Sequence, residues 1–179
     1  MGLFAFQVVG HAMEGNVLSA EMFFSILLRW VHFVAGIVWI GLLYYFNLVQ
    51  IPFLKKTDPA TKSGVVLQLL PRALWWFRWS ALVTVLAGLG LMMGGRIRNV
   101  YIMIGATLGL IMFLNVWLII WPSQKVVIRM TAEMTATKTP PPAEMAKYAR
   151  RTFLASRTNF ILSFPMLLFM GMSAHFPLF

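Results

Sequence analysis

The stretch MFFSILLRWVHFVAGIVWIGLLYYFNLVQ, residues 22–50, is an almost continuous apolar run that only Arg29 and His32 interrupt. An α-helix rises 1.5 Å per residue, so a helix of this length is longer than the hydrocarbon core of a bilayer, which is roughly 30 Å thick. The stretch therefore predicts a membrane-spanning helix with one end protruding or with a tilted axis.

Three further apolar stretches follow, at residues 73–94, 100–121 and 153–176. The chain is 60% hydrophobic and only 11% charged, whereas a soluble domain carries about 25% charged residues. The sequence thus predicts an all-α integral membrane four-helix bundle, with residues 1–179 forming a single membrane domain.

Prolines mark the expected helix ends, because proline lacks a backbone N–H and its ring crowds the preceding turn. Pro52 ends the first helix, Pro122 stops the third, and Pro165 is expected to kink the fourth. Residues 122–152 form the longest polar segment and are expected to be a cytoplasmic loop. Within it, the prolines at 140–142 separate a helical extension from a second short helix.

Basic residues predict the orientation of the bundle, because they concentrate on the cytoplasmic side of a membrane protein. The opposite side holds only three of them, Arg29, Arg96 and Arg98. The first and third connections, which share a side, hold eleven: Lys55, Lys56, Lys62, Arg72, Lys125, Arg129, Lys138, Lys147, Arg150, Arg151 and Arg157. Both termini are therefore expected to face outward, toward the periplasm if the membrane is a bacterial inner membrane. The net charge of +10 is explained by contacts with lipid headgroups, not with nucleic acid.

Small residues on three of the expected helices predict close helix packing. Gly105 and Gly109 form a GxxxG pair in the third stretch. Such faces let two helix backbones approach each other closely in lipid. They indicate packing more than chemistry.

Several kinds of chemistry are excluded by composition. The chain has no cysteine, which removes disulfides, thiolate metal sites, iron–sulfur clusters and covalent haem attachment. All five acidic residues lie outside the apolar stretches. A buried carboxylate, on which proton-coupled transporters depend, is therefore missing, and a metal site with three or four protein ligands is not expected.

Two histidines lie at matching depths in the expected bundle. His32 lies near the outer end of the first helix, which runs inward, and His175 lies near the outer end of the fourth, which runs outward. Two neutral imidazoles that face each other across a bundle can ligate the iron of haem b from both sides. The pair therefore predicts a haem b site with His32 and His175 as axial ligands. The alternative is that both are interfacial histidines with ordinary hydrogen-bond partners.

Residues next to the histidines fit the same hypothesis. Gly36 follows His32 by four residues, and Gly171 precedes His175 by four, so each helix has a gap on the histidine's own face. A macrocycle needs such gaps. Arg29, one turn outward from His32, is a candidate partner for a haem propionate.

A second group of polar residues is expected near the inner face. Five side chains from all four helices could converge there in one polar pocket: Asn47, Arg78, Asn115, Arg157 and Asn159. The functional interpretation is a site for an anion, a quinone or a second propionate. The structural one is hydrogen bonding between helices, with arginines that extend toward the headgroups.

Local motifs of the chain resemble the membrane part of the cytochrome-c-linked bacterial urate oxidases. The resemblance covers all four stretches in order, in the segments Arg29–His32, Gly36–Gly41, Tyr44–Asn47, Trp75–Trp79, Asn115–Pro122, Gln124–Lys125, Ala155–Asn159 and Ser163–Met166. It implies a bacterial inner-membrane protein connected to electron transfer. Members that oxidise urate continue into a C-terminal cytochrome c domain, whereas this sequence ends at Phe179 without a CxxCH motif. Urate oxidation is therefore not expected, and the electron partner is expected to be another chain.

Taken together, these observations predict a membrane-embedded, haem-b-binding electron-transfer module or redox-complex subunit. Its partners would be the bilayer, other membrane subunits or a periplasmic cytochrome c, and a quinone as a further candidate. Two other classes stay open. One is a cofactor-free structural or accessory subunit of a larger membrane complex. The other is a small-solute channel or transporter, which the missing buried carboxylate disfavours.

Overall fold

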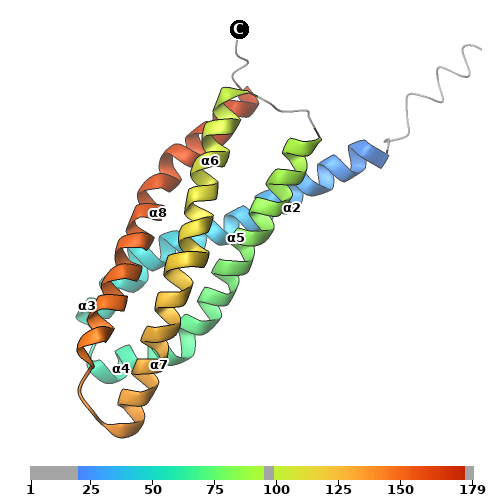
Figure 1. Ribbon diagram of the computed structural model, residues 1–179. Coiled ribbons are helices and arrows are strands. Elements are labelled where there is room, and N and C mark those ends of the chain that lie inside the picture. Colours follow the sequence, from blue (N-terminus) through green and yellow to red (C-terminus); the bar gives the residue numbers. More distant parts are fainter. Residues whose placement is uncertain (1–19, 95–98, 176–179) are drawn as a thin grey trace, which may run out of the picture.

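The computed structural model describes residues 20–94 and 99–175, with side chains up to Ser173. Within these ranges the chain forms four long helical rods (Figure 1). All four are long and apolar enough to cross a membrane: Ala20–Lys56, Pro59–Met93, Val100–Thr137 and Ala143–Ser173. The prediction of an all-helical chain with four such helices is confirmed.

Each of the first three rods consists of two α-helices joined by a short π-helix. The first contains α2 (Ala20–Tyr44), η1 (Tyr45–Gln50) and α3 (Ile51–Lys56). The second contains α4 (Pro59–Gly64), η2 (Val65–Leu69) and α5 (Leu70–Met93). The third contains α6 (Val100–Asn115), η3 (Val116–Ile120) and α7 (Trp121–Thr137), and the fourth is α8 (Ala143–His175) alone.

Each of the three π-helices in the described residues is followed, after one intervening residue, by a proline. Pro52, Pro71 and Pro122 each occupy the second position of the α-helix that follows a π segment. A π turn contains one extra residue, and local π geometry lets a membrane helix accommodate a proline without losing its backbone hydrogen bonds. The expectation that the third helix stops at Pro122 is therefore wrong, because the rod continues through this proline to Thr137.

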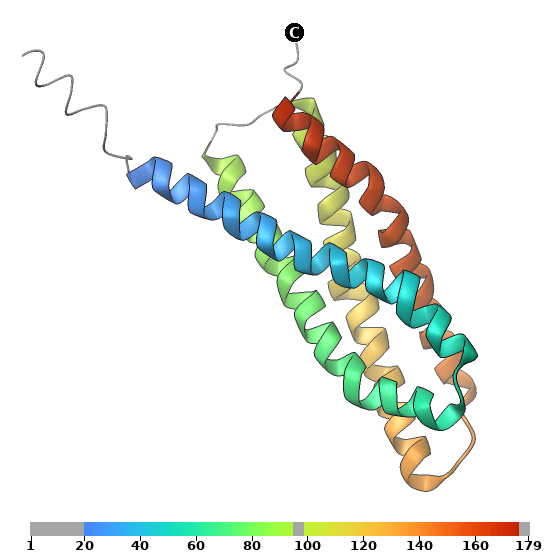
Figure 2. The same cartoon turned by 180° about the vertical axis from the view of Figure 1, so that it is seen from behind.

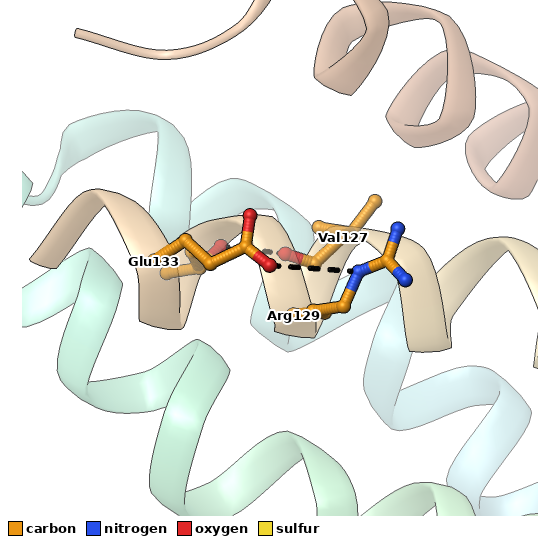
Figure 3. A network of polar contacts seen from close by, with 4 residues as sticks. Val127, Arg129 and Glu133 are labelled. Carbon is orange, nitrogen blue, oxygen red and sulfur yellow. Dashed lines mark hydrogen bonds and ion pairs between the residues drawn. The ribbon is translucent and has the colours of Figure 1, made fainter. Parts of the chain in front are cut away.

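The segment 122–152 is correspondingly more helical than a loop. Only Lys138 to Pro142 lie outside α7 and α8, and Lys138 ends α7 in the left-handed conformation, with φ of 54°. α7 is amphipathic. It buries Ser123, Val127, Met130 and Thr131 and exposes Arg129 and Glu133, which form an ion pair at 3.7 Å (Figure 3).

The bundle consists of two antiparallel pairs, α2 with α5 and α6 with α8 (Figures 1 and 2). We call the end with the short connections at 57–58 and 138–142 the connection end, and the opposite end, where α2 starts and α8 finishes, the terminal end. The two pairs pack together toward the connection end. In both views the first turns of α2 diverge from the last turns of α8.

Most of the core accordingly lies away from the start of α2. Trp39 and Leu43 are the only buried residues of α2, and they pack with Phe77 of α5 and with Met112 and Val116 of the third rod. The stretch from Ala20 to Val38 buries no side chain in the described structure. One side of this half contacts α5, through His32 and Leu28, and the rest of its surface has no cover among the described residues.

Capping residues position two of the helix starts. Asp58 accepts hydrogen bonds from the backbone N–H groups of Ala60 and Thr61 at 3.0 Å and thereby caps α4. Hydrogen bonding, above all from the Thr61 side chain, holds the pKa of Asp58 below its ordinary value of 3.8. Asn99 caps α6 through Ile102, and its Nδ2 also donates to the carbonyl of Ser173 on α8, at 3.1 Å.

The predicted GxxxG pair lies where α6 crosses α8. A Cβ at Gly105 would lie 3.2 Å from Cγ of Met170 and 3.3 Å from its backbone nitrogen, so this glycine permits the close approach of the two helices. A Cβ at Gly109 would meet only Cγ of Met166, at 4.0 Å, which is ordinary contact.

We therefore expect Gly105→Leu to destabilise the protein and Gly109→Ala to leave it nearly unchanged. Overpacking at Gly105 should cost about 1–3 kcal/mol, the usual range for extra methylenes in a tight core. Thermal unfolding of the two purified variants in detergent measures the difference. Equal melting temperatures would contradict the close crossing of α6 and α8.

Candidate functional site

His32 lies on α2 and turns its ring toward α5. The ring is half-buried, and its Nδ1 lies 2.8 Å from the carbonyl oxygen of Thr84. A carbonyl oxygen can only accept a hydrogen bond, so Nδ1 must carry the proton. In the neutral ring this leaves Nε2 as the nitrogen with the free lone pair. The hydrogen bond therefore selects the tautomer that can bind a metal ion through Nε2.

Gly88 of α5 provides the space for this ring. A Cβ added at Gly88 would lie 3.0 Å from Cε1 and 3.1 Å from Nδ1 of His32. Such a distance is shorter than van der Waals contact, so a larger residue would displace the imidazole. The contacts of His32 thus define a site between α2 and α5.

The other residues of the predicted haem site are distributed differently. Gly36 packs against α5, where a Cβ would lie 3.7 Å from the Cγ2 methyl of Thr84. Gly171 on α8 is exposed, and a Cβ there would have nothing within 4 Å. His175 is the last residue of α8, and its side chain lies outside the described residues.

Arg29 lines a groove of about 400 Å³ between α2 and α5 at the terminal end. Glu21, Ser25 and Leu28 line the same groove, and they lie on the face of α2 that carries His32, at helical spacings of four and three residues. On the other side the groove is lined by Gly90 and Leu91 of α5 and by Gly94, the residue that follows this helix. Gly88, which contacts the His32 ring, precedes Gly90 by two residues on α5. The groove therefore begins about one helical turn from this ring, toward the terminal end.

A buried polar seam runs along one face of α8. Its four members, Thr152, Ser156, Asn159 and Ser163, are spaced by four, three and four residues, which places them on a single helix face. Their exposed fractions are 5%, 8%, 0% and 0%. The whole seam is therefore withdrawn from solvent and lipid.

One of the five predicted pocket residues, Asn159, is a member of this seam, and two others, Asn47 and Asn115, donate hydrogen bonds to it. Asn47 donates to Ser156 Oγ at 2.9 Å, and Asn115 donates to Asn159 Oδ1, also at 2.9 Å. Asn159 in turn donates to the carbonyl of Met112 at 2.9 Å. These bonds join the first, third and fourth rods near the middle of the bundle.

Three of the four seam members, Thr152, Ser156 and Ser163, were not predicted from the sequence. Ser163 donates to the hydroxyl of Tyr44 at 3.1 Å, and Ser156 accepts from Asn47. The 4–3–4 spacing with Thr152 and Asn159 was the available signal, since serine residues in a helix attract little notice individually.

The seam and the part of the first rod that faces it also contain buried polar atoms without a hydrogen-bond partner among the described residues. They are Oδ1 of Asn47, Oε1 of Gln50 and Oγ1 of Thr152. Gln50 lies one turn after Asn47, and Thr152 lies one turn before Ser156 on an antiparallel helix. The connection end of the seam thus has hydrogen-bonding capacity left over, which ordered water commonly satisfies.

The two arginines of the predicted pocket lie apart from the seam. Arg78 stacks on indoles, with its Cζ 3.8 Å from the ring centre of Trp121 and 5.3 Å from those of Trp79 and Trp117. Arg157 lies over Phe153 and Phe160 of its own helix, at 5.6 Å and 5.8 Å. The structure therefore places the five pocket residues in three separate settings.

A multi-ligand metal centre is not found among the described residues, where no three His, Cys, Asp or Glu side chains come together. His32 could still serve as an axial ligand, because haem iron needs only one or two protein ligands.

Removing the amides of Asn115 and Asn159 should reveal the energy of their bond. A double-mutant cycle with Asn115→Ala and Asn159→Ala is expected to give a coupling of about 0.6 kcal/mol and no more than about 1.7 kcal/mol, the mean and the maximum for hydrogen bonds between membrane helices. The measurement is unfolding of the wild type, both single variants and the double variant in detergent. Additive effects of the two changes would show that the two amides are not coupled.

Comparison with known proteins relates the second half of the chain to a described family. No curated protein and no solved structure matches the chain. The family model described as "Urate oxidase N-terminal" matches residues 96–179. The match includes Asn115, Asn159 and the α8 seam, but not His32 or Arg78. From residue 96 onward, in α6, η3, α7 and α8, the chain is thus similar to the urate oxidase N-terminal family.

Proposed function

We propose that this protein is a haem-b-binding electron-transfer subunit of a bacterial inner-membrane redox complex. The observation that carries the proposal is the hydrogen bond from Nδ1 of His32 to the carbonyl of Thr84, at 2.8 Å. Histidines that bind metals typically donate their second ring nitrogen to a carbonyl or carboxylate, which orients the ring and increases its basicity. His32 has this arrangement, with Nδ1 on the carbonyl of Thr84 and Nε2 left for a metal.

The residues around His32 are suited to hold one of the two axial ligands of a haem. Nε2 of His32 would bind the iron, Gly88 accommodates the imidazole, and Arg29, in the adjacent groove, would pair with a propionate. His175 is the candidate for the second axial position. When bound, haem b would supply a one-electron redox centre. The chain itself orients the ligand and retains the proton on Nδ1.

The proposed orientation decides which partners could exchange electrons with the haem. With the basic connections in the cytoplasm, the terminal end, His32 and both termini face the periplasm. Electrons would then pass between a periplasmic cytochrome c or another membrane subunit and the quinone pool. The similarity of residues 96–179 to the urate oxidase N-terminal family supports a role in a membrane oxidoreductase. Urate oxidation itself is not part of the proposal.

The purified protein is expected to show a reduced-minus-oxidised difference spectrum with a b-type α band. His32→Ala should lower the haem-to-protein ratio by at least about tenfold, because even changes beyond the direct ligands cost 10- to 100-fold in metal affinity. His175→Ala tests the second ligand in the same assay. A wild-type protein with no α band after expression with added haem would overturn the proposal, as would full haem retention in the double variant.

Two glycine variants provide a matched pair for the same spectrum. Gly88→Ala places a methyl group 3.0 Å from Cε1 of His32, so it should shift the α band or lower haem occupancy. Gly41→Ala, on α2, meets nothing within 4 Å and should leave the spectrum unchanged. Identical spectra for both variants would contradict the proposal that His32 is part of the haem site.

A second candidate function is a cofactor-free accessory subunit, and the uncovered half of α2 favours it. Residues 20–38 bury no side chain in the described structure, and large apolar groups such as Phe24, Trp30 and Ile37 are exposed there. A partner helix would cover this face. Purification from native membranes would then yield a stable complex without pigment, whereas a pigmented complex would favour the first proposal.

A further inference from the structure

Arg78 lies in a cage of three indole rings and has no anionic partner in the part of the chain that the structure describes. The cage consists of Trp79 on α5, Trp117 on η3 and Trp121 on α7, and Trp79 and Trp117 also contact each other at 5.8 Å. Among the described residues, no hydrogen bond or ion pair involves Arg78, and its Nε is buried without an acceptor. Cation–π contacts use the face of the guanidinium and leave its N–H edge available for an acceptor.

A second donor next to Arg78 has the same deficit. The indole Nε1 of Trp117 is buried and has no acceptor among the described residues. Indole N–H is a donor only, and a buried donor without an acceptor costs about 1–3 kcal/mol. Nε of Arg78 and Nε1 of Trp117, two donors from neighbouring helices, could therefore both be satisfied by one ligand that accepts hydrogen bonds.

The charge at this position indicates that the ligand is an anion. Lys125 of α7 lies with its Nζ 5.7 Å from the ring centre of Trp121, the ring on which Arg78 stacks at 3.8 Å. The two positive charges are thus no further apart than these distances combined, which is within the Debye length of about 10 Å at 0.1 M salt. An anion between them would relieve their repulsion.

The described part of the chain offers no carboxylate for this role. Asp58 caps α4, and Glu133 pairs with Arg129 on the exposed side of α7 (Figure 3). Glu21 lies at the start of α2, at the terminal end, and Glu144 is exposed in the first turn of α8. Among the described residues, therefore, no carboxylate is placed to pair with Arg78 or Lys125.

The surroundings of the cage match the boundary between headgroups and acyl chains. Trp75, Trp76 and Trp79 are exposed at this level of α5, and tryptophans gather at membrane interfaces. Toward the terminal end the neighbouring exposed side chains are apolar, with Val83 on α5 and Leu114 on α6. Toward the connection end they become charged, beginning with Lys125.

We propose that Arg78, Trp117 and Lys125 bind a phosphate anion, supplied by the headgroup of an anionic phospholipid whose acyl chains lie along α5 and α6. Arginine suits this ligand because its fork of N–H groups matches two phosphate oxygens. Basic sites between membrane helices are known places for anionic headgroups. The site is independent of His32 and of haem. A free phosphate ion would satisfy the same donors.

Native mass spectrometry of the full-length protein in detergent separates these sources, because each bound species has its own mass. The probes are dioleoyl phosphatidylglycerol, dioleoyl phosphatidylcholine and inorganic phosphate. We expect the first phosphatidylglycerol to bind about fivefold more tightly than phosphatidylcholine, the effect of roughly one basic residue at a membrane surface. Equal affinities would overturn the proposal. A phosphate adduct that displaces phosphatidylglycerol would retain the phosphate chemistry and overturn the lipid source.

Charge-matched variants locate the site. Arg78→Gln should remove the preference for phosphatidylglycerol, whereas Arg72→Gln, which removes an exposed charge from the same helix, should retain it. Arg78→Lys maintains the charge and is expected to bind with intermediate affinity. If Arg78→Gln and Arg72→Gln weaken binding equally, the attraction is general and the site does not exist. Helical content and elution volume verify that each variant is folded.

Discussion

The hydrogen-bonded seam on α8 is the constraint around which the bundle is arranged. In a membrane, polar side chains that point between helices must find their partners inside the protein, because lipid offers none. Ser156, Asn159 and Ser163 find theirs on the first and third rods, through Asn47, Asn115 and Tyr44. Apolar packing alone would let these rods rotate about their axes, whereas the directional bonds select one rotation for each. Beyond Ser163 the same face of α8 continues with Met166 and Met170 against the glycines of α6, so polar pairing gives way to close backbone contact.

The sequence determines the number and approximate position of the helices, but not their ends. The apolar stretches at 22–50 and 100–121 correspond to real helices because their hydrophobicity is long and continuous. Proline was the misleading signal. Pro122 does not stop the third rod because η3 provides an extra residue in the preceding turn. Whether a proline ends a helix or follows a π turn depends on what packs around it, which a single sequence does not encode.

The candidate site was predictable in its residues more than in its arrangement. His32 and Arg29 stand out in any reading as polar groups in an apolar stretch, and the structure gives His32 a specific hydrogen-bond partner. That this partner is Thr84 of α5 could not be foreseen, because depth in the membrane does not reveal which helices are neighbours. The same limit applies to Asn47, Arg78 and Arg157. They lie near one level of the bundle, but their helix faces direct them to a serine, to indoles and to phenylalanines.

The capping of α6 by Asn99 has a mechanical consequence for the end of α8. The same side chain that begins α6 also holds the carbonyl of Ser173, two residues before His175. Together with the tight crossing at Gly105, this ties both helices into one hairpin that shifts as a unit. A displacement that carries His175 toward α2 would therefore either break the bond from Asn99 to Ser173 or carry the start of α6 with it.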